Sequence, residues 1–485
     1  MEQIKRTMKL PFLPVQSAEN FGEQPAVITP ERHFSFNELL GIIQTAATAL
    51  EKAGLHPGDR LAIEAQSTIE VIALFWAAIA GKISVALMSP RLPDQTFTEL
   101  LQYLNCSIAY INSERTLHSG VHKLYWPPEA RAGEHVNPFL PQSVNEEQPA
   151  TIIFTSGSTG KPRAVLHAYR NHYYSALGSN QNIPLQPGDR YMLSLPLFHV
   201  AGIAILFRTM LAAASLVLPD KNSSLAENII CFKPTHLSLV AAQLSDLLNN
   251  PQVPPSLTGV KTILMGGSAM PQSLLQKAFA RGWPLVVSYG STEMSSQITA
   301  TAPGAPFEDW QTSGRLLPYR ELKISGSGEI LVRGKTLFPG YLNGDKIQVK
   351  LTSNGWFATG DLGLLDAQGR LTVKGRKDRM FISGGENIYP EEIERALEQL
   401  PSVSRAVVVA VPHTRFGQRP VAFVQTAEIH DFDEAALKKA LRNVLPGFKI
   451  PMRIFDWPKD APSGMKVDLQ WFGAKAADLV EKEEG

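Results

Sequence analysis

The sequence predicts an α/β protein whose large N-terminal part is followed by a small β module and then by a separate α+β domain. Three observations support this prediction. Helical and strand-like patterns alternate up to the strand at residues 285–288, short strands with Gly-rich turns fill residues 311–373, and a charged break at residues 375–379 precedes a mixed pattern of about a hundred residues. Alternating helices and strands are typical of a parallel sheet with helices packed on it.

The first 150 residues contain two helix and strand pairs. Residues 36–53 and 68–81 show helical periodicity, whereas residues 60–64 and 83–88 form short apolar runs that indicate strands. Residues 127–148 carry several Pro and acidic residues and are expected to form a surface connection.

Residues 151–164, TIIFTSGSTGKPRA, begin as a buried strand and then turn into small and hydroxylated residues. Bare backbone N–H groups, hydroxyls and nearby cations suit a bound phosphate. The candidate phosphate-binding residues are Thr155, Ser156, Gly157, Ser158, Thr159, Gly160 and Lys161. The spacing argues against the P-loop of NTPases, because its first glycine would fall at Thr155 and Pro162 replaces the Mg²⁺-binding hydroxyl. On composition alone, a phosphate cradle and a flexible surface loop both remain open.

The alternation continues through residues 190–195, 206–218, 236–248 and 261–266. Open α/β sheets bind ligands at the carboxyl ends of their strands, so the polar residues at these ends are candidates for a site. His199 follows the first of these strands, and taken alone it is expected to be structural more often than catalytic.

A strand at residues 285–288 leads into a hydroxyl-rich turn with one carboxylate. The turn consists of Tyr289, Gly290, Ser291, Thr292 and Glu293. Hydroxyls beside a carboxylate could serve a nucleotide phosphate and its Mg²⁺, because hard cations take oxygen ligands. A turn followed by a helix N-cap explains the same residues equally well.

The β module contains a second carboxylate at the end of a predicted strand. Strands are expected at residues 321–324, 329–332, 356–358 and 370–373, and Asp361 closes the third of them. A carboxylate there could accept hydrogen bonds from the hydroxyl pair of a ribose, and an ordinary Asp turn fits equally well.

The C-terminal domain is predicted to begin after the charged break. It should contain a helix at residues 390–399, a strand at 404–411 and a helix at 433–444. Lys466 lies in a predicted turn, where a lysine is normally a solvated surface residue.

Composition excludes several classes of function. The 485 residues carry a net charge of +1 with no basic block, so neither nucleic acid nor an anionic membrane surface is an expected partner. The apolar stretches 71–80 and 200–218 are not expected to span a membrane, because the first is too short and the second contains Arg208. The N-terminus shows no signal-peptide pattern, and Cys106 and Cys231 have no metal-ligand spacing, so the cytoplasm is the expected location.

Taken in order, these motifs resemble those of the adenylate-forming enzymes, which include acyl-CoA synthetases, adenylation domains and luciferases. The matching stretches are the cradle, residues 289–293, Thr359-Gly360-Asp361, Gly375-Arg376-Lys377-Asp378 and Lys466. The resemblance implies a large N-terminal domain of two α/β subdomains and a small β-barrel, residues 1–377, and a mobile α+β C-terminal domain, residues 378–485.

Within that superfamily, four segments look most like the o-succinylbenzoyl-CoA synthetases of menaquinone biosynthesis. They are LSLPLFHVAG, SGGENIYPEEIE, FGQRP and a C-terminal Gly-x-Lys-Val. Aryl-CoA ligases such as the chlorobenzoate enzymes share the second segment closely, so a ligase for another aryl or medium-chain acid, or an adenylation enzyme that loads a carrier protein, remains an alternative.

The resemblance implies a reaction with a small carboxylic acid, ATP, Mg²⁺ and CoA. The cradle would hold the β- and γ-phosphates, Thr292 would contact the α-phosphate and Glu293 would hold Mg²⁺. Asp361 would bind the ribose with help from Arg376. Dimers are common in such enzymes.

The same resemblance assigns roles to the C-terminal domain and the acid pocket. Asp378 corresponds to a hinge for domain rotation, and Lys466 would bridge the acid's carboxylate and the α-phosphate during adenylation only. The residues expected at the pantetheine channel are Gly384, Gly385 and Glu386, and those expected in the acid pocket are His199, Arg208 and Gln243. Two departures from the family pattern are Arg163-Ala164 after the cradle Pro and Met465 between Gly464 and Lys466.

Overall fold

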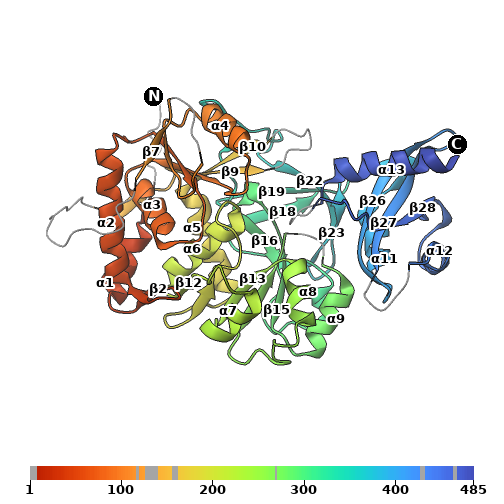
Figure 1. Ribbon diagram of the computed structural model, residues 1–485, viewed down its shortest axis with the longest axis horizontal. Coiled ribbons are helices and arrows are strands. Elements are labelled where there is room, and N and C mark those ends of the chain that lie inside the picture. The colour runs from red at the N-terminus through yellow and green to blue at the C-terminus, as the bar shows by residue number, and fades with distance from the viewer. Residues whose placement is uncertain are drawn as a thin grey trace.

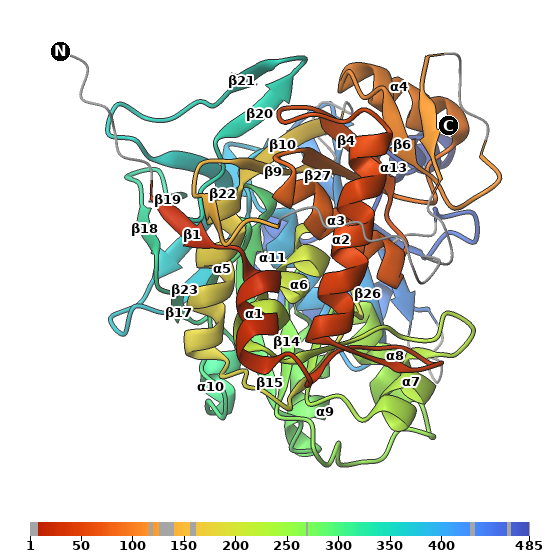
Figure 2. The same ribbon diagram turned by 90° about the vertical axis from the view of Figure 1, so that its left-hand side faces the viewer.

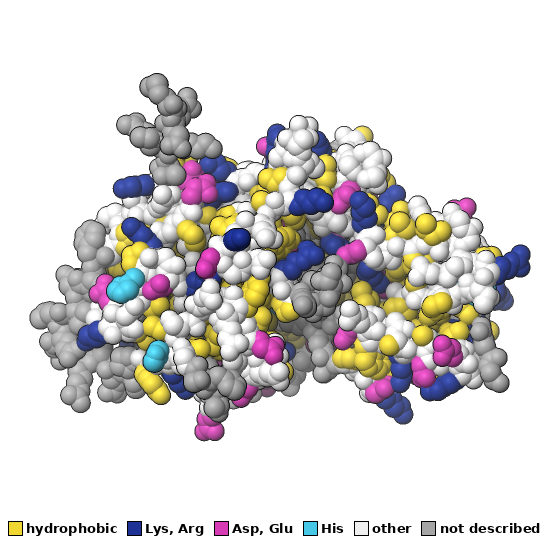
Figure 3. All heavy atoms as spheres, turned by 90° about the horizontal axis from the view of Figure 1, so that it is seen from above, with side chains coloured by type: hydrophobic (Ala, Val, Ile, Leu, Met, Phe, Trp, Pro, Cys, Tyr) yellow, Lys and Arg dark blue, Asp and Glu magenta, His cyan; other side chains and the backbone are white. Residues whose placement is uncertain are grey.

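The computed structural model describes residues 8–115, 120–125, 140–155, 162–267, 270–426, 432–462 and 467–484. Figure 1 shows a large body, which holds the N-terminal helices and two large sheets, joined to a smaller C-terminal body next to β22 and β23. Seen from above, Lys and Arg side chains gather near the junction of the two bodies (Figure 3).

The first large sheet has eight strands, and its centre is parallel. β4 pairs with β5, and β5 pairs with β9, all three running parallel. On its other side, β9 pairs with β10, which runs antiparallel to it. In spatial order the strands are β21 (Lys346–Gln348), β20 (Gly340–Asn343), β10 (Arg163–Ala168), β9 (Pro149–Thr155), β5 (Ser84–Met88), β4 (Arg60–Glu64), β6 (Ile108–Tyr110) and β7 (His122–Leu124).

The second large sheet has nine strands, with a parallel centre and antiparallel strands at both edges. The edge formed by β15, β16 and β17 contains the hydroxyl-rich turn between its first two strands. The strands are β17 (Arg315–Leu316), β16 (Ser296–Ala300), β15 (Leu285–Ser291), β14 (Thr262–Met265), β13 (His236–Leu239), β11 (Arg190–Met192), β12 (Ser215–Val217), β2 (Pro25–Ile28) and β3 (His33–Ser35). A separate pair joins β1 (Lys9–Pro11) to β8 (Ser143–Asn145).

Ten helices of the large body are described, and several of them form the core between the sheets. Figure 2 shows α1, α2 and α3 on the side of the body that faces the viewer. The helices are α1 (Leu13–Phe21), α2 (Phe36–Lys52), α3 (Ile69–Ala80), α4 (Asp94–Tyr103), α5 (Tyr169–Asn182), α6 (Val200–Ala212), α7 (Leu225–Phe232), α8 (Ala241–Asn249), α9 (Gln272–Ala280) and α10 (Phe307–Trp310). Trp76 and Phe207 are fully buried, with ring centroids 4.9 Å apart, so α3 and α6 meet through their largest side chains.

The β module is a four-stranded antiparallel sheet, β18 (Arg320–Ile324), β19 (Glu329–Gly334), β22 (Phe357–Leu365) and β23 (Leu371–Arg376). Its buried side packs with Val165 of β10 and with Met294 and Ile298, which flank the hydroxyl-rich turn. This shared core fixes the module against the edges of both large sheets.

The C-terminal body is an α+β unit with two cores, one on each side of its sheet. Its elements are β24 (Phe381–Ser383), β25 (Glu386–Ile388), α11 (Pro390–Glu398), β26 (Val403–His413), β27 (Gly417–Thr426), α12 (Glu434–Arg442), β28 (Arg453–Asp456) and α13 (Leu469–Glu484). None of the helices in the described part of the chain combines the length and apolar content that a membrane crossing requires.

Several sequence-based boundaries differ from the structure. Both large sheets have antiparallel edges where a parallel sheet was expected, and β10, which was not predicted, directly follows the cradle. Asp361 lies in the middle of β22 and does not close a strand, because β22 continues to Leu365. The strand expected at residues 190–195 ends at Met192.

Candidate active site

The phosphate cradle begins where β9 ends. Thr155 is the last residue of β9 and pairs with Arg163, the first residue of β10. The Arg163 guanidinium lies 5.4 Å from the centre of the Tyr341 ring. The other predicted cradle residues, Ser156, Gly157, Ser158, Thr159, Gly160 and Lys161, lie outside the described residues, as does Lys466.

Tyr289, Gly290 and Ser291, which were expected in a turn, form the end of β15 and extend the predicted strand by three residues. The chain then reaches β16 through a single 3-10 turn, η1 (Thr292–Met294). Ser291 occupies the N-cap position, but its side chain makes no cap hydrogen bond. Its Oγ is buried and has no hydrogen-bond partner within the described residues. The N-cap alternative is therefore wrong for Ser291, and among the described residues its buried hydroxyl is left available for a ligand.

Gly290 is required by the close approach of β15 and β16. A Cβ at this position would lie 2.0 Å from the carbonyl oxygen of Ser296. Any side chain would therefore push the two strands apart and move Thr292 and Glu293 with them.

Glu293 is held at both its backbone and its side chain. Its carbonyl accepts a hydrogen bond from the Phe338 N–H at 2.8 Å, and its carboxylate accepts one from the Tyr341 hydroxyl at 2.7 Å. Burial and the neighbouring Glu293 charge raise the pKa of Tyr341, so this hydroxyl remains a donor.

Asp361 forms a small polar cluster with Tyr289 and Arg376. The Tyr289 hydroxyl donates to Asp361 Oδ2 at 2.6 Å, and Arg376 Nη1 donates to Asp361 Oδ1 at 3.2 Å. Burial raises the pKa of Asp361, whereas the Tyr289 hydrogen bond and the Arg376 charge lower it, and the net shift is upward. The structure thus brings three of the predicted nucleotide residues together.

Arg376 connects this cluster to the predicted hinge. Its Nε and Nη2 donate to the two carboxylate oxygens of Asp378, both at 3.0 Å, while its Nη1 reaches Asp361. This paired hydrogen bond lowers the pKa of Asp378. One guanidinium therefore bridges two carboxylates that belong to different predicted domains.

The donor set at Glu293 fits magnesium held jointly with a nucleotide. Within the described ranges, no three His, Cys, Asp or Glu side chains gather as a ready-made metal site. Magnesium usually takes one or two protein carboxylates and completes its shell with water and substrate phosphates. A single carboxylate oriented by Tyr341 meets that requirement.

His199 is the N-cap residue of α6, and its ring packs against Phe198 at a centroid distance of 4.6 Å. Gln243 lies in the first turn of α8, where its Oε1 accepts from the Val240 N–H at 3.1 Å and its Nε2 donates to the Ser194 carbonyl at 3.0 Å. Gln243 thus ties the start of a helix to the segment after β11.

Arg208 lies in the interior of α6 and is only 2% exposed. Its Nη2 donates to Gln297 Oε1 at 2.8 Å and reaches Ser296 Oγ at 3.5 Å, next to the 292–294 turn. Its Nε has no hydrogen-bond partner, and Arg208 forms no ion pair, among the described residues. A buried cation without an anion is costly, so this arrangement favours a negatively charged ligand.

Sequence reasoning missed the residues that support the predicted ones. Tyr341 is far from Glu293 in sequence, and only the pairing of β10 with β20 brings it there. Tyr191 and Gln297 contact Arg208 from two different strands. No local motif marks these residues, because each is placed by a long-range strand pairing.

Gly384 and Gly385 form the two-residue turn between β24 and β25, with φ of 59° and 91°. Positive φ at both positions is typical of a tight hairpin turn, and this local geometry is enough to explain why both residues are glycine. Together with Glu386 they share no hydrogen bond or ion pair with the nucleotide cluster in the described structure.

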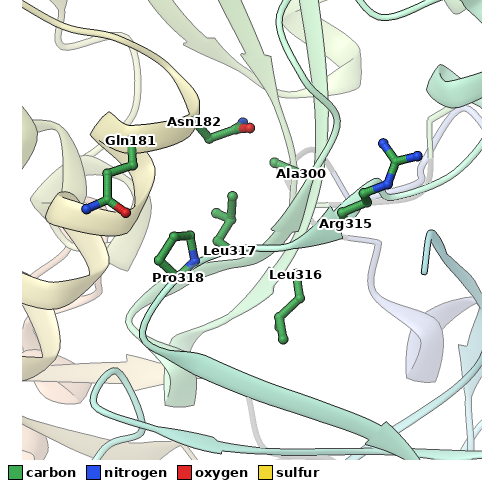
Figure 4. Close-up of a pocket in the computed structure, with 7 residues that line it drawn as sticks. All are labelled: Gln181, Asn182, Ala300, Arg315, Leu316, Leu317 and Pro318. Carbon is green, nitrogen blue, oxygen red and sulfur yellow. The ribbon is translucent and has the colours of Figure 1, made fainter. Parts of the chain in front are cut away.

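A cavity of about 230 Å³ lies elsewhere, between the end of α5 and the segment after β17 (Figure 4). It is lined by Gln181, Asn182, Ala300, Arg315, Leu316, Leu317 and Pro318, and none of these is a predicted site residue.

Comparison with known proteins gives a consistent assignment. Residues 15–342 match the AMP-binding enzyme family, and residues 392–461 match the AMP-binding enzyme C-terminal domain. The 2-succinylbenzoate-CoA ligase of Geobacillus kaustophilus is 32% identical over 459 residues, which cover 90% of this chain and 93% of the relative.

Two solved structures of the o-succinylbenzoate CoA synthetase (MenE) of Bacillus subtilis are similar in fold. The complex with ATP and a magnesium ion superposes with a TM-score of 0.85 at 28% identity, covering 96% of this chain and 100% of that one. The complex with the acyl-adenylate intermediate OSB-AMP superposes with a TM-score of 0.83 at 28% identity, covering 96% and 98%.

Proposed function

The chain belongs to the AMP-binding enzyme family, and from this premise we propose that it is an ATP-dependent ligase that converts o-succinylbenzoate to o-succinylbenzoyl-CoA in menaquinone biosynthesis. The reaction passes through an acyl-adenylate and releases AMP and pyrophosphate. The observation that carries the choice of acid is the buried Arg208 beside the 292–294 turn, because o-succinylbenzoate has a second carboxylate that needs a cationic partner.

In the first step, the aromatic acid's reacting carboxylate attacks the α-phosphorus of ATP, and pyrophosphate leaves. Protein groups contribute positioning and electrostatic stabilisation, because the negative charge is spread over phosphate oxygens. Thr292 would contact the α-phosphate, and Thr155 with residues 156–161 would hold the β- and γ-phosphates. Lys466 would bridge the acid's carboxylate and the α-phosphate. Glu293 would hold Mg²⁺, which when bound offsets negative charge on the nucleotide.

The nucleotide's ribose would be bound at Asp361. The pair of hydrogen bonds from Tyr289 and Arg376 orients this carboxylate, which leaves its remaining lone pairs for the two ribose hydroxyls. Gly290, which keeps β15 close to β16, would hold the backbone of this segment in place beside the nucleotide, and Ser291 would offer it a hydroxyl.

In the second step, the CoA thiolate attacks the acyl carbon, the thioester forms and AMP leaves. The C-terminal domain, which we assign to residues 378–485 after an N-terminal domain of residues 1–377, would rotate about Asp378. Rotation would bring the exposed turn of Gly384, Gly385 and Glu386 to the pantetheine channel, where a glycine permits close backbone approach.

The acid's second carboxylate would pair with Arg208, and His199 would orient the acyl group from the start of α6. Gln243 would support this pocket indirectly, because both polar groups of its side chain are already hydrogen bonded. Its Oε1 accepts from the N–H of Val240 at the start of α8, and its Nε2 donates to the carbonyl of Ser194 after β11. The unpartnered Nε of Arg208 supports the assignment of Arg208 over Gln243.

The partners in this proposal are small molecules, namely the acid, ATP and CoA, and the supply of ATP and CoA supports a cytoplasmic location. A homodimer is the assembly implied by the resemblance to adenylate-forming enzymes, and sedimentation velocity would test it.

The proposal is tested by incubating the protein with ATP, CoA and a panel of acids while measuring AMP release. We expect the highest kcat/KM with o-succinylbenzoate; strongest activity with benzoate or octanoate would contradict the assigned acid. Thioester formation on a carrier protein but not on free CoA would instead support a stand-alone adenylation enzyme.

A variant sharpens this test. Arg208→Met should raise the KM for o-succinylbenzoate by about 10- to 100-fold, the range expected for a lost charged hydrogen bond, and should leave the activity with benzoate within a few-fold. The control Arg442→Met changes an exposed residue of α12 and should alter neither substrate.

A further inference from the structure

Two buried histidines lie behind the 292–294 turn and are not explained by the proposed chemistry. His167 comes from β10 and His172 from α5, and both are almost fully buried. Their rings lie 4.8 Å apart, and the Thr151 hydroxyl lies within hydrogen-bond distance of both. Neither histidine forms an ion pair with a described residue, so pairing with a described carboxylate does not explain why the two rings are buried.

The four ring nitrogens each have a hydrogen-bond partner. His167 Nε2 lies 2.7 Å from the Thr292 carbonyl oxygen, and His167 Nδ1 lies 3.2 Å from Thr151 Oγ1. His172 Nε2 lies 2.7 Å from the same Thr151 oxygen, and His172 Nδ1 lies 2.9 Å from Ser295 Oγ. We call Ser295, His172, Thr151 and His167 the histidine chain.

The direction of every hydrogen bond in the histidine chain follows from one acceptor. The Thr292 carbonyl can only accept, so His167 Nε2 carries the proton and, in the neutral ring, Nδ1 accepts from the Thr151 hydroxyl. Thr151 has then used its only proton, so it accepts from His172 Nε2, and His172 Nδ1 accepts from Ser295. Burial lowers the pKa of His167 to about 4 and that of His172 well below its usual value, which keeps both rings neutral as this order requires.

The histidine chain connects both ends of the turn that carries Thr292 and Glu293 to the first large sheet. Thr151 and His167 face each other across β9 and β10, and the chain ends at the carbonyl of Thr292 and the side chain of Ser295. Ser295 has a left-handed backbone with φ of 55°, which is uncommon for serine, and its N–H also donates to the Thr292 carbonyl at 3.0 Å. The turn is therefore closed by its own backbone and oriented by the histidine chain.

We propose that His167 and His172, linked through Thr151, are positioning residues that fix the orientation of Thr292 and Glu293 for adenylation. This inference rests on the proposed function, because it assumes that Thr292 and Glu293 act on the nucleotide. Since the turn retains its own backbone hydrogen bond, breaking the histidine chain loosens the turn without removing any group that contacts ATP. A misplacement of about 1 Å costs a rate factor on the order of 100.

The test uses two variants that break the histidine chain and two that preserve it. Thr151→Val is nearly isosteric and replaces the hydroxyl with a methyl group, and His167→Leu removes both ring nitrogens and their hydrogen bonds. Each of these two variants should lower kcat for acid-dependent pyrophosphate exchange by about 10- to 100-fold. The KM for the acid should change less than about threefold. Thr151→Ser and His167→Gln keep a donor and an acceptor in place and should recover most of the activity. Thr98→Val is the matched control, because its buried hydroxyl has no partner in the described structure, and it should behave like the wild type.

The outcome separates this inference from the proposed function. The positioning role would be overturned if Thr151→Val and His167→Leu exchanged pyrophosphate at the wild-type rate. It would also be overturned if Thr151→Ser and His167→Gln lost as much exchange activity as the two disrupting variants. If the wild type adenylates a different acid, the assigned substrate fails, and the same five variants are then compared with that acid. AMP affinity, measured by calorimetry without any acid, gives a second readout and should fall in the two disrupting variants only.

Discussion

At the scale of single residues, Asp361 illustrates how neighbours prepare a carboxylate for a neutral ligand. Burial favours its protonated form, and the Tyr289 hydroxyl and the Arg376 guanidinium oppose that effect by hydrogen bonding to its two oxygens. The carboxylate is thus already oriented for the ribose that we propose it binds, and this order would lower the entropy cost of binding.

Asp361→Asn should raise the KM for ATP by about 10- to 100-fold with a smaller effect on kcat, because hydrogen bonds to a charged acceptor contribute about 1.5–3 kcal/mol. Initial rates at varied ATP concentration measure this. Asp366→Asn, in the turn between the same two strands, is the control and should leave the KM for ATP unchanged. An unaltered KM in Asp361→Asn would contradict ribose binding at this residue.

His167 also predicts a dependence of stability on pH. Its pKa is about 4 in the folded protein and about 6.5 when unfolded, so between these values the unfolded chain binds a proton that the folded chain does not. The free energy of unfolding should therefore fall as the pH drops from 6.5 towards 4, by about 3 kcal/mol from this group, and rise again when the pH is restored. Urea unfolding at several pH values measures the effect, and His167→Gln should show a shallower dependence than the wild type.

At the scale of elements, the glycine between Thr359 and Asp361 controls where Arg376 can lie. Gly360 has φ of 77°, and a Cβ there would lie 2.8 Å from Arg376 Nη2. β22 and β23 are therefore paired closely enough that only glycine leaves room for the guanidinium.

Gly360→Ala should displace Arg376 and break its hydrogen bond to Asp361. The KM for ATP should then rise roughly 10-fold, as expected when one hydrogen bond to a charged group is lost. Gly355→Ala is the matched control: its φ of 75° imposes a similar backbone strain, but a Cβ there meets nothing within 4 Å. Both variants should lose thermal stability to a similar degree, and only Gly360→Ala should change nucleotide affinity. Equal KM values in the two variants would show that the position of Arg376 does not matter for ATP.

The elements that could be predicted from the sequence are those set by local periodicity. α2, β4 and α3 lie within about one residue of their expected bounds, because each has a regular apolar pattern and α2 and α3 begin at capping residues, Ser35 and Thr68. β10 was missed because its strand character depends on pairing with β9 and β20, which no local signal reports. The start of α6 at Val200, six residues before the expected one, was missed because no N-cap side chain marks it.

The site follows the same division. Asp361, Glu293 and Tyr289 could be predicted from polar residues that follow apolar strand patterns, and the structure brings Asp361 and Tyr289 into contact. Tyr341, Gln297 and the histidine chain could not be predicted, because these residues act on the site through contacts between strands that are distant in sequence.

At the scale of the whole molecule, the two bodies meet near β23 and α11. The Arg395 guanidinium donates to the Val373 carbonyl at 3.1 Å, and Gln399 Nε2 donates to Gln272 Oε1 of α9 at 3.0 Å. The backbone N–H of Arg376 also donates to Glu391 Oε1 at 3.3 Å. Partly exposed polar contacts of this kind, seen among the described residues, are typical of domains that move relative to each other.

Lys466→Ala tests the proposed division of labour between the two steps. Adenylation, measured as pyrophosphate exchange, should fall by orders of magnitude, whereas thioester formation from supplied acyl-adenylate should be nearly unchanged, because we propose that the lysine acts in one domain orientation only. Lys475→Ala, which removes another lysine of the C-terminal body that pairs with Asp460, should affect neither step. Equal losses in both half-reactions would contradict the proposed role.

The shared guanidinium of Arg376 has a thermodynamic consequence for the proposed rotation about Asp378. The same side chain is hydrogen bonded to the carboxylate proposed to bind ribose and to the carboxylate proposed as the hinge. Any orientation that weakens the hinge contact must change how firmly Arg376 holds Asp361, and hence the affinity for nucleotide. Because linkage is reciprocal, a nucleotide whose ribose is held at Asp361 must bias the orientation by the same factor.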